Sequence, residues 1–344
     1  MIIFYIAIFI LSIIGIKLSK DGYHKNYLSK ESTNAIKGIF LLFIVVSHAL
    51  PYVTRCGYEF NGLGDNLLRT INIAMGQLVV VMFLFYSGYG IGESYKKKGD
   101  TYVKRMPTHR VLNTLLNFDV AVLIFAVVCL FLSIPFSTKQ FFLSLIAWDA
   151  LGNSNWYIFC ILTCYTISYI VLKVSPPNTK HTNTILTFIS LIVVSLVLSL
   201  FKQSWWYNTM WAYGAGFAYS CLKPQIEKRL KSHYFMALCL VTFLFIALFL
   251  LKYEYRGIRY NLLSISFAVL VVIISMKITI NNPILCWVGK NLFPMYIYQR
   301  LPMLYMSHQN SAFCGNYPVV FITISLVATI FISYFYKYWQ ISLK

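Results

Sequence analysis

Apolar runs of about 18 or more residues recur along almost the whole chain, and no other feature constrains its fold as strongly. A helix of that length spans the hydrocarbon core of a bilayer, whose interior offers the backbone no hydrogen-bond partner. Of the 344 residues, 59% are hydrophobic and 11% are charged, whereas a soluble domain carries about 25% charged residues. The sequence therefore predicts an integral membrane protein that crosses the bilayer many times.

We expect the fold class to be all-α, a polytopic transmembrane helix bundle of about 11 spans. The first apolar run lacks a charged leader and a small-residue cleavage site, which favours a retained helix over a signal peptide. The seventh run is short, and Pro294 and Pro302 interrupt the tenth. The predicted spans are 2–18, 35–53, 71–92, 111–133, 154–174, 183–201, 205–221, 234–252, 259–279, 286–306 and 317–336.

The net charge of +19 comes mainly from lysines and arginines in the short loops between the apolar runs. This distribution favours contact with anionic membrane lipids and argues against a nucleic-acid partner. Counted with the residues near the adjoining span ends, the loops after the odd-numbered spans and the C-terminus hold 20 of the 29 lysines and arginines, the other loops hold 8, and Lys37 completes the total. The positive-inside rule then predicts an N-terminus outside the cell and a C-terminus in the cytoplasm.

The second predicted span carries two ionisable residues, Lys37 and His48, and such residues inside a membrane helix often mark a functional site. Eleven residues separate them, which places both within roughly 20° of one helix face and about 16 Å apart along the axis. A buried neutral histidine is a suitable general base near neutral pH. A packing histidine and a lysine that extends to the membrane surface are the alternative.

The third predicted span ends in a segment rich in small residues, Ser87-Gly-Tyr89-Gly-Ile-Gly92. Such a segment suits close helix packing or the close approach of a ligand. The most basic loop follows and contains Arg105 and Arg110. It is either a solvated topology signal or a site for a polyphosphate. Arg110 either forms an ion pair with Asp119 in the fourth span or binds a ligand.

Asp149, Asn155, Trp156 and Tyr157 cluster at the predicted outer start of the fifth span. An interfacial aromatic belt explains Trp156 and Tyr157 without any ligand. Asn155 offers amide N–H groups that could donate hydrogen bonds to a substrate.

Arg300 lies within or at the edge of the tenth predicted span, where a guanidinium needs a partner or a polar pocket. The eight cysteines show no CxxC spacing, so we expect no metal site. Cys56 and Cys314 both fall in predicted outer loops, and a disulfide between them stays open.

Two of these segments resemble motifs of acyltransferase family 3, a family of membrane proteins that commonly O-acylate envelope carbohydrates. Lys37-x10-His48 is similar to the Arg/Lys-x10-His pattern on the first core helix of that family. The segment 83–89, Phe-Leu-Phe-Tyr-Ser-Gly-Tyr, is similar to its aromatic-rich F-x-x-SG-[FY] helix end.

Two further segments extend the resemblance over residues 33–336 in the expected order. Lys104-Arg105 through Arg110 resembles the basic stretch that opens the next helix, although its spacing is wider than a tight Arg-x-x-Arg. Residues 289–298 resemble the late G-x-x-S-x-x-(I/L)-Y-(L/I) segment. Gln299-Arg300 stands where many members have a histidine, which puts a second catalytic histidine in doubt.

The resemblance implies an acyltransferase 3-like membrane domain of ten helices over residues 31–344, preceded by an additional helix and basic loop over residues 1–30. It implies a bacterial cytoplasmic (inner) membrane protein. The acyl donor would be cytoplasmic acyl-CoA, above all acetyl-CoA, and the acceptor would be a hydroxyl group of an extracytoplasmic or lipid-linked carbohydrate. No metal is expected.

Under this interpretation His48 is the general base, and the oxyanion is stabilised by Asn155, Tyr89 or a backbone N–H. The residues expected to hold the acyl-CoA are Lys37, Ser87, Arg105, Arg110 and Arg300. The residues expected to contact the carbohydrate are Trp156, Tyr157 and Asp149.

Three alternatives stay open at this point. Acyl transfer could proceed through an acyl-enzyme on Ser47 or Ser87. The chain could instead be a transporter or flippase for a carbohydrate or lipid-linked substrate, although no internal repeat typical of many transporters is visible. It could also be a non-catalytic membrane subunit. The sequence leaves the identity of the glycan, the length of the acyl group and the oligomeric state open.

Overall fold

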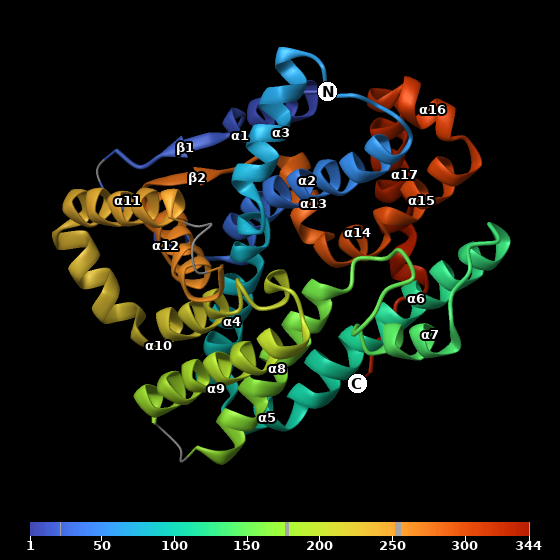
Figure 1. Cartoon of the computed structure of the whole chain (residues 1–344). Coiled ribbons are helices and arrows are strands. Elements are labelled where there is room, and N and C mark those ends of the chain that lie inside the picture. The colour runs from blue at the N-terminus through green and yellow to red at the C-terminus, as the bar shows by residue number, and fades with distance from the viewer. Residues whose placement is uncertain (21, 176–178, 252–255, 344) are drawn as a thin grey trace.

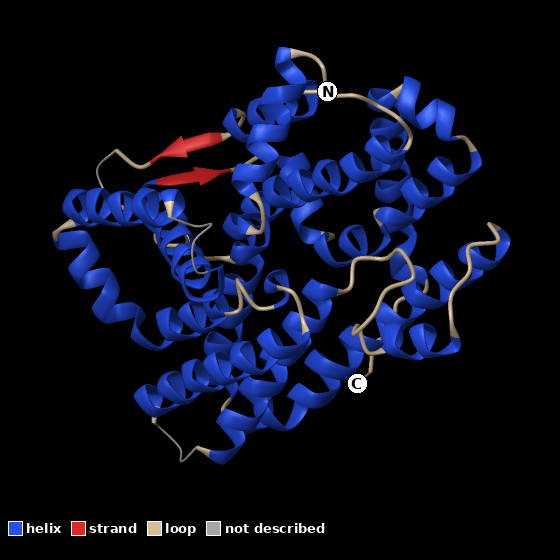
Figure 2. Ribbon diagram, in the orientation of Figure 1, coloured by secondary structure: helices blue, strands red, loops and turns tan. Residues whose placement is uncertain are grey.

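The computed structural model is a bundle of helices with a single pair of short strands among the residues it describes, which are 1–344 except 21, 176–178, 252–255 and 344 (Figures 1 and 2). The all-α prediction is therefore confirmed in its main feature. The helices are α1 (Ile3–Ile13), α2 (Lys30–Arg55), α3 (Leu63–Met75), α4 (Leu78–Lys98), α5 (Asp100–Met106), α6 (Asn113–Phe131), α7 (Thr138–Leu145), α8 (Trp156–Val174), α9 (Lys180–Phe201), α10 (Trp211–Ser232), α11 (Tyr234–Leu250), α12 (Arg256–Lys277), α13 (Pro283–Lys290), α14 (Leu292–Tyr298), α15 (Arg300–Gln309), α16 (Ser311–Asn316) and α17 (Pro318–Phe335).

Seven helical segments within the described ranges are long and apolar enough to cross a membrane, and the bent pair α10–α11 would bring this number to eight. The chain is thus an integral membrane protein, whereas the predicted number of about 11 spans is not confirmed. The seven segments are Lys30–Arg55, Leu63–Lys98, Asp100–Phe131, Trp156–Val174, His181–Phe201, Gly257–Lys277 and Pro318–Tyr338.

Short or broken helices explain why two of the predicted spans are not among these segments. Helix α1 has 11 residues, and the chain then enters strand β1 (Ile16–Leu18), which pairs antiparallel with β2 (Ile278–Ile280). Eleven residues make a helix of about 16 Å, well short of a hydrocarbon core of about 30 Å. Residues 286–306 are divided among α13, α14 and α15. Pro294 and Pro302 each stand in the first turn of a new helix, where proline is tolerated.

Glycines bring the central helices into close contact. A Cβ at Gly88 on α4 would collide with the backbone of Tyr213 on α10, and one at Gly216 on α10 would collide with the backbone of Phe85. Helices α2 and α13 approach each other in the same way, because a Cβ at Gly289 would collide with the carbonyl of Asn34. The packing interpretation of the small-residue segment at the end of the third predicted span is confirmed for Gly88.

Figure 1 shows the C-terminal helices α14 to α17 beside the N-terminal helix α2, although about 250 residues separate them in sequence. All four C-terminal helices contact α2. This arrangement brings the tenth predicted span against the helix that carries His48, and it builds the site described next.

Candidate active site

His48 lies on α2 two turns before the end of the helix, at a point where three elements meet. Its Nδ1 atom is 3.5 Å from the hydroxyl oxygen of Ser154, which is buried just before α8. Its imidazole ring lies 6.3 Å from the buried ring of Tyr296 on α14. Segments far apart in sequence therefore meet at one imidazole.

A proline inside α2 opens the backbone beside His48. Pro51 has no N–H, so the carbonyl of Ser47, four residues earlier, lacks its usual helical hydrogen bond. Ser47 and His48 both line the cavities at this point. The helix thus presents a free carbonyl and an imidazole at adjacent positions.

Buried polar atoms without a well-formed hydrogen bond surround His48. Among the described residues, the Tyr296 hydroxyl, the Gln299 Oε1 atom and the Arg300 Nε atom are buried and make no hydrogen bond of good geometry, although Tyr296 approaches the Ser154 hydroxyl. Gln299 and Arg300 lie close enough to interact with the imidazole of His48. Each unsatisfied buried group costs about 1–3 kcal/mol, so three of them around one histidine require an explanation. A bound ligand with polar atoms of its own would supply the missing partners.

Two cavities reach His48. The larger has a volume of about 670 Å³, and the smaller has a volume of about 180 Å³. Ser47 and His48 line both, so the imidazole stands where the cavities adjoin. The larger cavity is also lined by Leu50, Pro51, Thr54, Arg55, Phe60, Arg69, Asn72 and Ile73, and the smaller is also lined by Ile44, Gly76, Gln77, Val79, Val80, Trp156, Trp205 and Tyr296.

The larger cavity extends from His48 toward the Arg55 end of α2, whereas the smaller one reaches back along α2 only to Ile44, and Lys37 lines neither. Arg55 lies seven residues beyond His48, which is about 10 Å along the same helix face. Lys37 lies on this face as well, about 16 Å in the other direction. The helix face that carries Lys37 and His48 therefore continues to a second cation, Arg55, which the sequence analysis did not include.

Arg300, which the sequence predicts to bind the cofactor, lies close enough to His48 for an electrostatic interaction, and its cofactor role stays a prediction. Arg110 lies elsewhere, in a π-helical turn between α5 and α6, where its Nε donates a hydrogen bond to the Tyr102 hydroxyl at 3.2 Å. Its guanidinium also lies 5.9 Å from the ring centroid of Tyr165. The ion pair between Arg110 and Asp119 that the sequence left open is not formed in the described part of the chain.

The other predicted cofactor residues lie on separate helices. Arg105 is exposed on α5, Ser87 is half-buried on α4, and Lys37 is half-buried on the first half of α2. None of the three lines a cavity that reaches His48. Their role stays a prediction.

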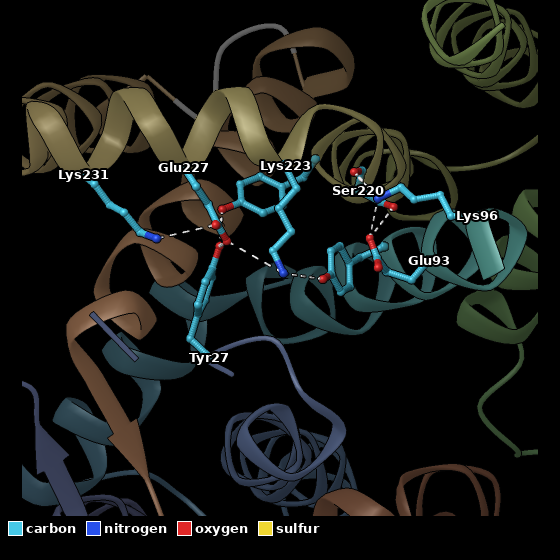
Figure 3. A network of polar contacts seen from close by, with 9 residues as sticks. Tyr27, Glu93, Lys96, Ser220, Lys223, Glu227 and Lys231 are labelled. Atoms are coloured by element: carbon cyan, nitrogen blue, oxygen red, sulfur yellow. Dashed lines mark hydrogen bonds and ion pairs between the residues drawn. The ribbon is translucent and has the colours of Figure 1, made fainter. Parts of the chain in front are cut away.

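Tyr89 belongs to a polar network between α4 and α10 (Figure 3). Its hydroxyl accepts a hydrogen bond from Lys223 Nζ at 3.0 Å. Lys223 and Lys231 both pair with Glu227, at 3.8 and 3.7 Å, and Tyr27 donates a hydrogen bond to the same carboxylate at 2.9 Å. The predicted oxyanion role of Tyr89 stays a prediction, and its contacts here are those of a structural residue.

Asn155 organises the segment that leads into α8. Its Nδ2 donates hydrogen bonds to the carbonyls of Ala147 and Asp149, at 3.1 and 2.9 Å. Both of its N–H groups are therefore used, and the neighbouring Ser154 is the residue that approaches His48. Asp149 accepts a hydrogen bond from the backbone N–H of Ala150 at 2.8 Å. The catalytic role predicted for Asn155 has no free donor to support it in this arrangement.

Of the predicted acceptor residues, Trp156 lies nearest to the site, because it lines the smaller cavity with His48. Tyr157 is buried and packs its ring against Tyr296, with 5.2 Å between the ring centroids. The ring of Tyr157 therefore helps to hold the ring of Tyr296 in place. Sequence reasoning missed Ser154, whose only signal was its position next to Asn155. It noted Gln299 only as part of the Gln299-Arg300 pair that stands where many family members have a histidine.

The thiols of Cys56 and Cys314 are both free and lie close enough to interact. The sequence had left a disulfide between them open. No group of three or more histidine, cysteine or acidic side chains capable of holding a metal ion occurs in the described ranges.

Comparison with known proteins gives one match, to a family model that covers most of the chain. A family model described as an acyltransferase domain matches residues 31–338, nearly the whole chain. Neither the curated proteins nor the solved structures gave a match. All five residues that meet at the imidazole, namely His48, Ser154, Tyr296, Gln299 and Arg300, lie within the matched range.

Proposed function

We propose, from the premise that this chain belongs to the acyltransferase 3 family, that it transfers an acyl group from acyl-CoA to a hydroxyl group of a glycan. Membership of that family makes the chain a membrane acyltransferase. We assign acetyl-CoA as the donor and an extracytoplasmic or lipid-linked glycan in the bacterial inner membrane as the acceptor. The N-terminus would lie outside and the C-terminus in the cytoplasm.

One observation carries this proposal: His48 stands where a large and a small cavity adjoin. A transferase must bring two substrates to one point, and two cavities that share an imidazole suit that task. The smaller cavity, of about 180 Å³ and partly apolar, suits a short acyl group. The larger, of about 670 Å³, suits a sugar.

His48 accepts the proton of the acceptor hydroxyl as its oxygen attacks the thioester carbonyl. Because Ser154 lies on the Nδ1 side of the ring, we assign the proton transfer to Nε2. The new C–O bond forms, and the C–S bond breaks. The imidazolium returns its proton to the departing thiolate, so that the histidine ends neutral as it began.

We assign the stabilisation of the oxyanion that forms during this attack to Tyr296 and Arg300. Their hydroxyl and Nε groups are buried beside His48 and make no hydrogen bond of good geometry, so neither has to leave a well-formed hydrogen bond first. Preorganised donors of this kind stabilise developing negative charge strongly in a water-poor site. Asn155 and Tyr89 already have partners.

We assign the nucleotide portion of acyl-CoA to the basic residues Lys37, Arg105 and Arg110, which the sequence predicts on the cytoplasmic side. Lys37 lies about 16 Å from His48 along the helix, a distance that an extended pantetheine arm can cover. In this assignment Arg300 acts at the thioester of acyl-CoA and does not bind its phosphates.

The test incubates purified protein in lipid with labelled acetyl-CoA and membrane glycan fractions. The expected result is base-labile label on the glycan, together with thermal stabilisation of the protein by acetyl-CoA alone. A parallel reaction without the protein gives the background label. Movement of glycan across proteoliposomes without any transfer of label would contradict the proposal and favour a transporter.

A further inference from the structure

We propose that the acceptor carries an anionic group, a carboxylate or a phosphate, which Arg55 and Arg69 bind in the larger cavity. This inference rests on the proposed function and adds the charge of the substrate to it. Both arginines line the cavity, and no aspartate or glutamate is among its lining residues. The rest of the lining is apolar or neutral.

The two guanidiniums come from different helices and converge on one space. Arg55 lies in the last turn of α2, on the same face as His48 and about 10 Å from it along the axis. Arg69 comes from α3. A ligand in this cavity therefore meets an imidazole at one end and two permanent positive charges farther along.

Neither arginine is neutralised by the protein. No ion pair to Arg55 or Arg69 occurs in the described part of the chain. The nearby carboxylates are engaged elsewhere, because Asp65 pairs with the amino group of Met1 at 2.8 Å and accepts a hydrogen bond from Tyr58. That hydrogen bond raises the pKa of the Tyr58 phenol to about 12. Glu59 accepts a hydrogen bond from Asn61.

Aromatic rings support both guanidiniums without occupying most of their donors. Arg55 lies 4.7 Å from the ring centroid of Tyr52, and Arg69 lies 5.6 Å from that of Phe60. Arg55 donates its Nε–H to the Pro51 carbonyl at 3.1 Å and also hydrogen-bonds to the side chain of Tyr52. The remaining N–H groups match the oxygen atoms of a carboxylate or phosphate, to which arginine binds in a bidentate manner.

A third cavity indicates that the ligand extends past Arg55. Its volume is about 460 Å³, and Arg55 lines it as well as the larger cavity. Ser133, Ser307 and Ser311 supply hydroxyl groups there. An oligosaccharide reaching His48 with one sugar could thus continue past the arginine toward these hydroxyls.

The first experiment measures binding by calorimetry to the full-length protein in lipid nanodiscs. The probes are a glucuronate-containing oligosaccharide and its carboxyl-reduced counterpart, and a phosphorylated oligosaccharide and its dephosphorylated counterpart. We expect at least one charged probe to bind about tenfold or more tightly than its neutral counterpart, with an affinity that falls as salt rises. The pair that shows the preference identifies carboxylate or phosphate as the source of charge.

Arg55→Gln and Arg69→Gln should each remove most of this preference. Lys139→Gln is the matched control, because Lys139 is an exposed cation on α7 that lines none of these cavities. Equal affinity of the wild-type protein for charged and neutral probes, or a preference that survives both arginine substitutions, overturns the inference.

Binding needs no acyl donor, so the two proposals fail separately. Charge-selective binding without any acyl transfer would overturn the proposed function and keep the anion site. Acyl transfer to a neutral glycan without any charge preference would keep the proposed function and overturn the anion site.

Discussion

Two polar clusters of this membrane protein differ in how their charges and hydrogen bonds are satisfied. In the Glu227 network of Figure 3, two lysines share one carboxylate, and Tyr27 bonds to it as well. Around His48, by contrast, three buried polar atoms make no hydrogen bond of good geometry in the described structure, and Arg300 has no acidic partner there. Both clusters are built from distant segments.

The difference separates polar residues that stabilise the fold from polar residues that bind a substrate. A satisfied network stabilises helix packing and has no capacity left for a ligand. An unsatisfied cluster lowers stability unless a substrate completes it, and such exceptions are typical of functional sites. We therefore assign substrate chemistry to the His48 cluster and helix positioning to the Glu227 network.

Among the residues around His48, Arg300→Met is expected to have the largest effect. We expect kcat for acyl transfer to fall by about 10²–10³-fold, the usual cost of losing one oxyanion donor. Thermal stability should hold or rise, because no ion pair to Arg300 is broken within the described ranges. Arg229→Met, at an exposed position on α10, is the control and should leave both quantities unchanged. A melting temperature that drops with kcat would assign Arg300 to packing.

Glu227→Gln should show the opposite pattern. It weakens the interactions of one carboxylate with Tyr27, Lys223 and Lys231, and we expect a loss of about 1–3 kcal/mol in the free energy of unfolding. Activity per folded molecule should stay within a few-fold. Thermal unfolding in detergent measures the first quantity, and labelled acetyl transfer measures the second. Glu59→Gln, at an exposed loop position, should change neither.

Ser154→Ala has the smallest expected effect. The hydroxyl of Ser154 orients the imidazole through Nδ1, and a neutral hydrogen bond is worth about 0.5–1.5 kcal/mol. We expect kcat to fall about twofold to tenfold, with KM for acetyl-CoA nearly unchanged. Ser199→Ala, at an exposed position on α9, provides the comparison. An unchanged kcat would mean that Ser154 does not position His48.

The sequence predicted much of this architecture, because apolar runs report membrane helices directly. The predicted number of about 11 spans is not confirmed, since residues 2–18 and 286–306 are apolar enough but are divided into short elements. The sequence singled out His48 because an ionisable residue in an apolar helix is conspicuous.

The partners of His48 were harder to find. Arg300 was conspicuous for the same reason as His48, but nothing local reveals that α14 and α15 pack beside α2. Ser154 and Gln299 are ordinary residues that only tertiary packing brings to the imidazole.

The most direct measurement compares acyl transfer by His48→Gln and Tyr89→Phe, one variant from each cluster, in folded and inserted protein. We predict that His48→Gln lowers the rate of labelled acetyl transfer by about 10²–10⁴-fold, whereas Tyr89→Phe stays within a few-fold of wild type. A His48→Gln protein that transfers acetyl at the wild-type rate would contradict the account, because the reaction would then take place without the imidazole on which it depends.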